Sequence, residues 1–133
     1  MIKSLPVNDP GQLVLFGSGL DQGISDGFPN PWLFSYPFYC EMQRRNQVFS
    51  DVAAAFSMTD NIHGFIDGRK EPEAMNIQLA SGRYFAMLRV QAVIGRTLSE
   101  EDDRSEGGHP VAVVGHAWWK QTFPSDPAVL NRR

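Results

Sequence analysis

Pro110-Val-Ala-Val-Val-Gly115, followed directly by His116-Ala-Trp-Trp-Lys-Gln-Thr-Phe123, is the stretch of sequence that indicates the fold most clearly. The first part is an uncharged run rich in β-branched residues and closed by glycine, which predicts a short buried strand. The second part predicts a short helix, because Trp119 and Phe123 are four residues apart and share one face. Pro124 then ends this helix, since proline cannot donate the helical hydrogen bond.

The residues before this stretch predict further short strands and helices. Ser35 is a favourable N-cap for a helix that begins near Pro37, and Asp67-Gly68 is a strong hairpin signal. Residues 53–58 fit a strand or a helix by pattern alone. Separated strands and short helices, without a regular β-α-β alternation, predict an α+β fold with a mixed or antiparallel sheet. We expect a strand at 12–16, a Gly- and Pro-rich loop at 17–33, a helix at 37–46, a β-hairpin or meander across 52–80, a short helix at 83–88 and a capped acidic turn at 99–103.

Length and composition fit one domain or part of one. The 133 residues are 42% hydrophobic, which is enough to build a core. A net charge of −3 with scattered basic residues gives no footprint for nucleic acid. No apolar run approaches the ~20 residues that cross a bilayer, and the N-terminus lacks a secretory signal, so the sequence read alone predicts a soluble protein. The single cysteine, Cys40, excludes an internal disulfide and predicts a small buried side chain.

No pattern in the sequence predicts a catalytic, cofactor or metal site. The acidic run at 100–103 lacks the spacing of a calcium loop and is typical of a solvated turn that caps a helix. His63, His109 and His116 show no metal-ligand spacing. Gly17-Ser-Gly19 lacks the Gly-x-Ser-x-Gly pattern of a nucleophile turn, so a small hydrolase using Ser18 is only a remote alternative. We therefore expect no enzyme activity, no metal and no cofactor.

Aromatic residues crowd beside the Gly- and Pro-rich loop, with six of them between residues 28 and 39. One interpretation is a small core that fixes the loop to the first helix. The other is a contact surface for a partner protein or an apolar ligand, because aromatic residues dominate binding hot spots. On the later helix, adjacent tryptophans point about 100° apart, so we expect one to be buried and the other half exposed. The candidate contact residues are Trp32, Phe34, Tyr36 and Trp118.

A series of short motifs follows a recognisable order along the chain. The motifs are Ser35-Tyr-Pro-Phe-Tyr39, Arg44-Arg-Asn46, Leu79-Ala-Ser-Gly-Arg-Tyr-Phe85, Ile94-Gly-Arg-Thr-Leu98, Glu100-Glu-Asp-Asp103, Pro110-Val-Ala-Val-Val114 and Asp126-Pro-Ala-Val129. In this order they resemble the periplasmic core domain of MacB-like ABC transporter permeases, in particular the duplicated orphan permeases that carry no ATPase on the same chain. The resemblance covers roughly residues 10 to 131. Asn131-Arg132 stands where the family usually has Gly-Arg, and the Asn-Gly strand that follows in the family is absent from this sequence.

The resemblance implies that residues 1–133 are part of a MacB-like periplasmic core domain. Residues 1–10 would then be an N-terminal tail after a membrane helix outside this sequence, and residues 17–33 a loop. It also implies a strand rather than a helix at 53–58. The implied role is non-enzymatic: an extracytoplasmic, periplasmic domain of a permease subunit that couples ATPase-driven motion to export or to partner contact.

The partners implied by the resemblance are a separate cytoplasmic ATPase subunit, reached through membrane helices outside this sequence, and a second permease or another periplasmic protein. No nucleic acid is expected. A stand-alone truncated binding module is the main alternative. Because the strand that follows in the family is missing, we expect the isolated chain to expose a sheet edge and either to associate or to fold poorly.

Overall fold

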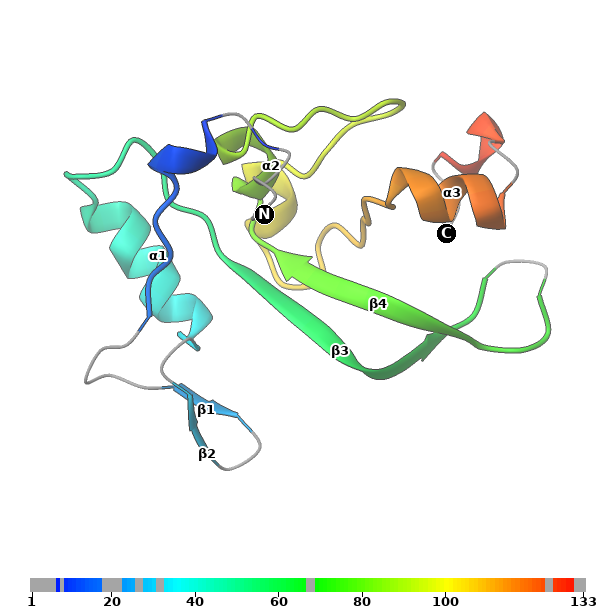
Figure 1. Cartoon of the computed structure of the whole chain (residues 1–133), viewed down its shortest axis with the longest axis horizontal. Coiled ribbons are helices and arrows are strands. Elements are labelled where there is room, and N and C mark those ends of the chain that lie inside the picture. Colours follow the sequence, from blue (N-terminus) through cyan, green and yellow to red (C-terminus); the bar gives the residue numbers. More distant parts are fainter. Residues whose placement is uncertain are drawn as a thin grey trace.

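The chain folds into short helices and two separate antiparallel hairpins (Figure 1). This computed structural model describes residues 7, 9–17, 23–25, 28–30, 33–66, 69–123 and 126–130. The predicted α+β class is confirmed. In chain order the elements are η1 (Pro10–Gln12), β1 (Gly23–Ser25), β2 (Phe28–Asn30), α1 (Tyr36–Arg45), β3 (Ala55–Gly64), β4 (Glu73–Ala80), α2 (Tyr84–Met87), η2 (Glu100–Asp103), α3 (His116–Thr122) and η3 (Pro127–Val129), where η marks a 3-10 helix.

The long hairpin formed by β3 and β4 is the central element. Its register pairs Ala55 with Ala80 at the open end, and a bulge between Met58 and Ile62 shifts the register along β3. Side chains of β4 alternate mostly between half-buried and exposed, as a strand with one covered face requires. The predicted hairpin is therefore confirmed, and so is the strand implied near residues 53–58. The predicted turn, Asp67-Gly68, lies outside the described residues.

Helix α1 forms where the capping residue predicts it. The Ser35 hydroxyl oxygen accepts a hydrogen bond from the Phe38 backbone N–H at 3.3 Å, which satisfies one of the free donors of the first turn. Tyr39 is the buried residue of this helix. Cys40 is exposed, so its predicted burial is wrong. Consecutive helical residues point about 100° apart, and the position that faces the interior belongs to Tyr39.

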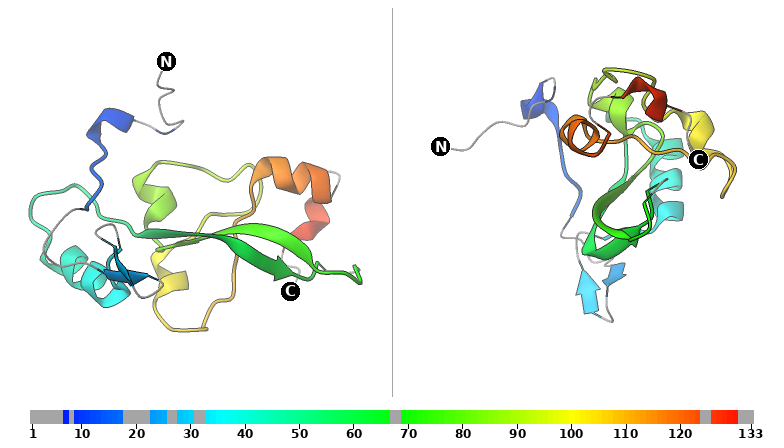
Figure 2. Two further views of the ribbon diagram at one scale, coloured as in Figure 1. Left: turned by 60° about the horizontal axis from the view of Figure 1, so that its bottom comes forward. Right: turned by 90° about the vertical axis from the view of Figure 1, so that its right-hand side faces the viewer.

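Helix α3 also forms as predicted, and its two tryptophans differ in burial as expected. Trp119 is buried and its indole N–H donates to the Asp126 carbonyl oxygen at 3.1 Å, whereas Trp118 is half-buried. The Arg69 guanidinium donates to the Thr122 carbonyl oxygen at 3.0 Å, which links the end of α3 to the segment that follows β3. These contacts place α3 at the far end of the long hairpin from α1 (Figures 1 and 2).

Two predicted strands are wrong. Of residues 12–16, Gln12 ends the 3-10 turn η1 and the other four form no strand, and residues 110–115 belong to no helix or strand. Both runs have the composition of strands. A strand also needs a neighbour that pairs with its backbone N–H and C=O groups, and no strand among the described residues pairs with either run.

The predicted loop at 17–33 contains structure that the sequence analysis missed. Strands β1 and β2 pair with Ser25 opposite Phe28, so two residues separate them. Those two residues are Asp26-Gly27, a dipeptide favoured in two-residue hairpins. The hairpin signal was present but lay inside a stretch dominated by glycine and proline.

Few side chains form a core. Among the described residues the buried apolar side chains are Tyr39, Val52, Ile66 and Trp119. Apart from the two hairpins, no pair of described helices and strands packs extensively. The end view in Figure 2 shows the helices arranged around the hairpin without a second layer closing over them. The described part of the chain is therefore open rather than built around one continuous core.

Candidate functional site

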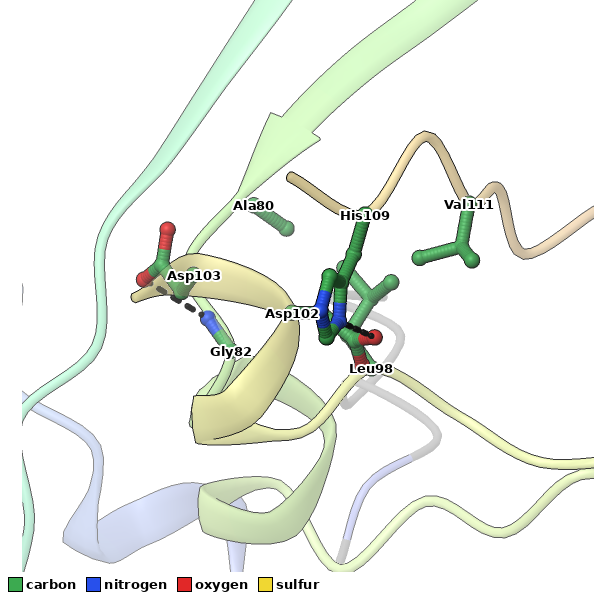
Figure 3. Close-up of a pocket in the computed structure, with 7 residues that line it drawn as sticks. All are labelled: Ala80, Gly82, Leu98, Asp102, Asp103, His109 and Val111. Carbon is green, nitrogen blue, oxygen red and sulfur yellow. Dashed lines mark hydrogen bonds and ion pairs between the residues drawn. The ribbon is translucent and has the colours of Figure 1, made fainter. Parts of the chain in front are cut away.

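The most closely packed part of the chain is the junction where β4 ends and α2 begins. Ser81 is buried, its N–H donates to the Ala54 carbonyl oxygen at 2.9 Å, and its hydroxyl accepts from the Ala54 N–H at 3.0 Å. The next residue, Gly82, donates its N–H to a carboxylate oxygen of Asp103 at 3.1 Å (Figure 3). A Cβ at Gly82 would lie 2.3 Å from the Ser99 carbonyl oxygen, so only glycine lets the two backbones approach this closely. The junction thus joins the hairpin to η2.

Asp102 holds η2 and the preceding loop together. Its side chain is only 5% exposed and accepts two hydrogen bonds from Arg96, at 2.5 and 2.7 Å. The backbone N–H and the hydroxyl of Ser99 also donate to it, at 2.8 and 2.9 Å. The Arg96 guanidinium and the Ser99 donors hold the pKa of Asp102 well below its usual range, against the opposing effect of burial. The predicted capped acidic turn is therefore confirmed: Ser99 is the N-cap residue of η2, and the Asp102 carboxylate accepts a hydrogen bond from its backbone N–H.

Two small cavities flank η2. One, of about 110 Å³, is lined by residues that include Leu98, Asp102, His109 and Val111 (Figure 3). The other, of about 210 Å³, lies between α1, α2 and η2 and includes Tyr36 in its lining. Both are below the roughly 300 to 1,000 Å³ that is typical of small-molecule sites.

The Arg83 guanidinium at the larger cavity is already paired. Arg83 lies 3.1 Å from Asp51 and 3.1 Å from Glu100. Partial desolvation of the hydroxyl, followed by its contact with Asp103, raises the pKa of Tyr36 above its ordinary value, so this hydroxyl stays protonated at neutral pH. Among the described residues no group of three His, Cys, Asp or Glu side chains is arranged to hold a metal ion.

The three residue types of a hydrolase triad lie together here, as Ser99, Asp102 and His109. Their side chains contact one another in a different order from that in a triad. In a triad the histidine lies between the serine and the carboxylate and removes the serine proton. Here the Ser99 hydroxyl donates to Asp102, and His109 lies 3.5 Å from the other oxygen of that carboxylate. This order leaves the serine without a base. Ser18, the serine of the hydrolase alternative, lies outside the described residues.

The candidate contact residues do not form one surface. Trp32 lies outside the described residues. Phe34 is half-buried and its ring stacks on Phe38, with centroids 5.1 Å apart, whereas Tyr36 is exposed on α1. Trp118 packs against Phe123 on α3 at the other end of the hairpin (Figure 1). Helices α1 and α3 are separated by the length of β3 and β4, so Tyr36 and Trp118 lie at opposite ends of the hairpin, and their role in partner contact stays a prediction.

Two uncovered apolar runs are the features that the sequence analysis did not assign to a contact. The N-terminal apolar segment, residues 13–16, includes Leu15, which is 87% exposed. The valine segment, residues 110–115, exposes Val111, Val113 and Val114. Both runs lack charge. Both were predicted to be strands, and the valine segment was predicted to be a buried one. Large uncovered apolar areas of this kind mark interaction surfaces.

The solvent-accessible surface of the whole chain is also larger than that of a complete folded monomer. The chain exposes 11080 Å². A complete folded monomer of 14.9 kDa exposes about 7,000 Å². The whole chain, including the residues outside the described ranges, thus exposes about 4,000 Å² more than a complete folded monomer of its mass.

Comparison with protein-family models, with curated proteins and with solved structures finds no significant match to this chain. Within the described residues, none of the helices has the length and apolar character that crossing a bilayer requires. The functional argument therefore depends on the residues and on their geometry.

Proposed function

We propose that this chain is part of the extracytoplasmic domain of a MacB-like ABC permease subunit and acts by contact and movement rather than by catalysis. The order of short motifs between residues 35 and 129 supports the family. The α+β arrangement of short helices and antiparallel strands is compatible with it. In this proposal, a separate cytoplasmic ATPase supplies the energy, and the domain passes motion to a substrate or to a periplasmic partner.

The observation that carries the proposal is the uncovered apolar surface. Residues 13–16 and 110–115 have the sequence of buried strands, yet they lie exposed and unpaired among the described residues. A segment with this composition is stable when a neighbouring strand covers it. We infer that further polypeptide of the same subunit supplies that cover, which fits a partial domain held between membrane helices.

The reading frame on either side of these codons tests the proposal most directly. We expect it to continue in both directions and to encode apolar segments of about 20 residues, long enough to span a bilayer. The chain extended by those residues, in membranes, should then copurify with an ATPase subunit. Stop codons directly on both sides would contradict the permease proposal and favour a stand-alone binding module.

A stand-alone binding module is the second candidate, because the same uncovered apolar surface suits a protein that docks on a partner. A screen with generic ester and peptide substrates separates both candidates from the remote hydrolase alternative. Activity that disappears in Ser18→Ala would overturn the non-enzymatic role. We expect neither the natural chain nor the Ser18→Ala variant to turn over any of these substrates.

A further inference from the structure

Asp103 differs from the other three carboxylates of η2. Each of those three pairs with an arginine, at distances between 2.5 and 3.1 Å. Among the described residues, no Lys, Arg or His side chain forms an ion pair with Asp103. Its partners are neutral: the Gly82 backbone N–H donates to it at 3.1 Å (Figure 3), and the Tyr36 hydroxyl contacts it. The negative charge of Asp103 is therefore held in place without being neutralised.

This carboxylate lines the larger of the two cavities beside η2, which has a volume of about 210 Å³. Two aromatic side chains of α1, Tyr36 and Tyr39, also line the cavity. Tyr36 is 50% exposed, so a group that enters from solvent can reach its ring. A cavity of this size is too small for a drug-sized ligand or a cofactor. It suits one long side chain of another polypeptide.

The charges around the cavity determine the sign of the group that it accepts. Its two lining arginines, Arg83 and Arg104, already pair with carboxylates at 2.8 to 3.1 Å. An anion would have to displace one of those carboxylates, and it would also lie near the charge of Asp103. A cation can pair with Asp103 while every existing ion pair stays intact. The cavity therefore favours a cationic group.

We propose that this cavity binds an arginine side chain of another protein, with the guanidinium paired to Asp103 and in contact with the Tyr36 ring. A planar guanidinium can donate two parallel hydrogen bonds to one carboxylate. It also stacks on aromatic rings and is more weakly hydrated than an ammonium group, so arginine suits the cavity better than lysine. This inference depends on the cavity and its charges and not on the permease proposal, since a stand-alone binding module would use the same site.

Two small probes test the sign and the identity of the bound group on the natural chain. They are N-acetyl-arginine amide and N-acetyl-citrulline amide, which have nearly the same shape and differ in charge. In a titration followed by nuclear magnetic resonance, we expect the arginine probe to shift the backbone amide signals of Gly82 and Asp103 with a dissociation constant of about 1 to 10 mM. The citrulline probe should give no saturable shift. Raising the salt concentration from about 0.02 to 0.5 M should weaken binding of the arginine probe, because salt screens the ion pair.

Asp103→Asn removes the unpaired charge and keeps an oxygen that accepts the Gly82 N–H. We expect it to weaken binding of the arginine probe about tenfold or more. Tyr36→Leu removes the ring and should weaken binding about threefold or more. Glu106→Gln is the matched control, because Glu106 is exposed and does not line the cavity, yet its loss changes the net charge equally. This variant should bind the arginine probe like the natural chain.

The comparison of the two probes uses the natural chain, so it remains decisive even where a variant fails to fold. Equal binding of the arginine and citrulline probes would overturn the proposal, as would the absence of saturable arginine binding up to about 50 mM. Signal shifts confined to residues away from the cavity would also overturn it. Among variants with the circular dichroism spectrum of the natural chain, equal binding by Asp103→Asn and Glu106→Gln would do the same.

Discussion

At the scale of single residues, Asp102 has the most demanding environment among the described residues. It is almost fully covered, yet it remains charged because Arg96 and Ser99 together supply four hydrogen bonds to its two oxygens. Charge-assisted hydrogen bonds of this kind contribute more than neutral ones. The same carboxylate fixes the loop that leads from α2 to η2, so the chemistry of one side chain sets the path of a whole segment.

The depressed pKa of Asp102 predicts a dependence of stability on pH. Its contribution is complete above the unfolded value of about 3.9 and is lost as the pH falls through the lower folded value. Asp102→Asn should lower the free energy of unfolding by about 1 to 3 kcal/mol at pH 7 and should flatten the acid limb of the stability curve. Urea unfolding from pH 7 down to about pH 2 measures both effects.

Glu101→Gln is the matched control, because Glu101 pairs with Arg104 at 2.8 Å on the surface, where both side chains are exposed. Removing this charge should change stability by no more than about 0.5 kcal/mol and should leave the acid limb unchanged. Equal effects of the two substitutions would contradict the role assigned to Asp102.

At the scale of elements, α3 is held by the burial of Trp119 and by the hydrogen bond that the Arg69 guanidinium donates to the Thr122 carbonyl oxygen. Trp119 is buried on one face of the helix and anchors η3 through its bond to the Asp126 carbonyl oxygen. Trp118, its neighbour, is half-buried and packs on Phe123, with ring centroids 5.5 Å apart. A seven-residue helix is too short to be stable by itself in water, so its docking through Trp119 maintains it.

Trp119→Ala should therefore release α3, at a cost of about 3 to 5 kcal/mol for the lost packing. Trypsin cleavage after Lys120, followed by mass spectrometry, should become much faster than in the natural chain, because Lys120 lies within α3 and a protease needs it unfolded. Trp118→Ala, at a half-buried position, should cost about 1 kcal/mol and change this cleavage little. Similar cleavage rates in both variants would show that α3 is held by other contacts.

At the scale of the whole molecule, the open surface sets the energetics. The fold buries about half of the surface of its unfolded chain, whereas a complete domain of this size buries about two thirds. Among the described residues, four apolar side chains are buried, while Leu15 and the valines at 111, 113 and 114 are exposed. Cover from further polypeptide of a permease subunit, as proposed above, would bring the burial closer to that of a complete domain.

The denaturant slope reports this burial directly, because it scales with the surface exposed on unfolding. For this chain, at a concentration low enough to keep it monomeric, we expect a urea m-value about 0.7 times that of complete domains of equal length. Equilibrium unfolding monitored by circular dichroism supplies the measurement. An m-value equal to that of complete domains would mean that the chain closes its own core in solution.

Much of the local structure could be predicted. Ser35 starts α1, the acidic run forms a capped turn, and the tryptophan pair divides between buried and half-buried, since each outcome depends on neighbours within a few residues. The Arg96–Asp102 pair was missed even though its residues lie close in sequence, because the pattern of a capping carboxylate does not reveal which arginine reaches it.

The sequence by itself determined the α+β class, the long hairpin and the three helices, because short-range periodicity and capping govern them. Only the tertiary structure decided that residues 12–16 and 110–115 remain unpaired, that Cys40 is exposed and that Tyr36 and Trp118 lie on separate elements. The physical reason is that strand formation and burial depend on partners distant in sequence, and a strand-like run without such a partner keeps its backbone and its valines exposed.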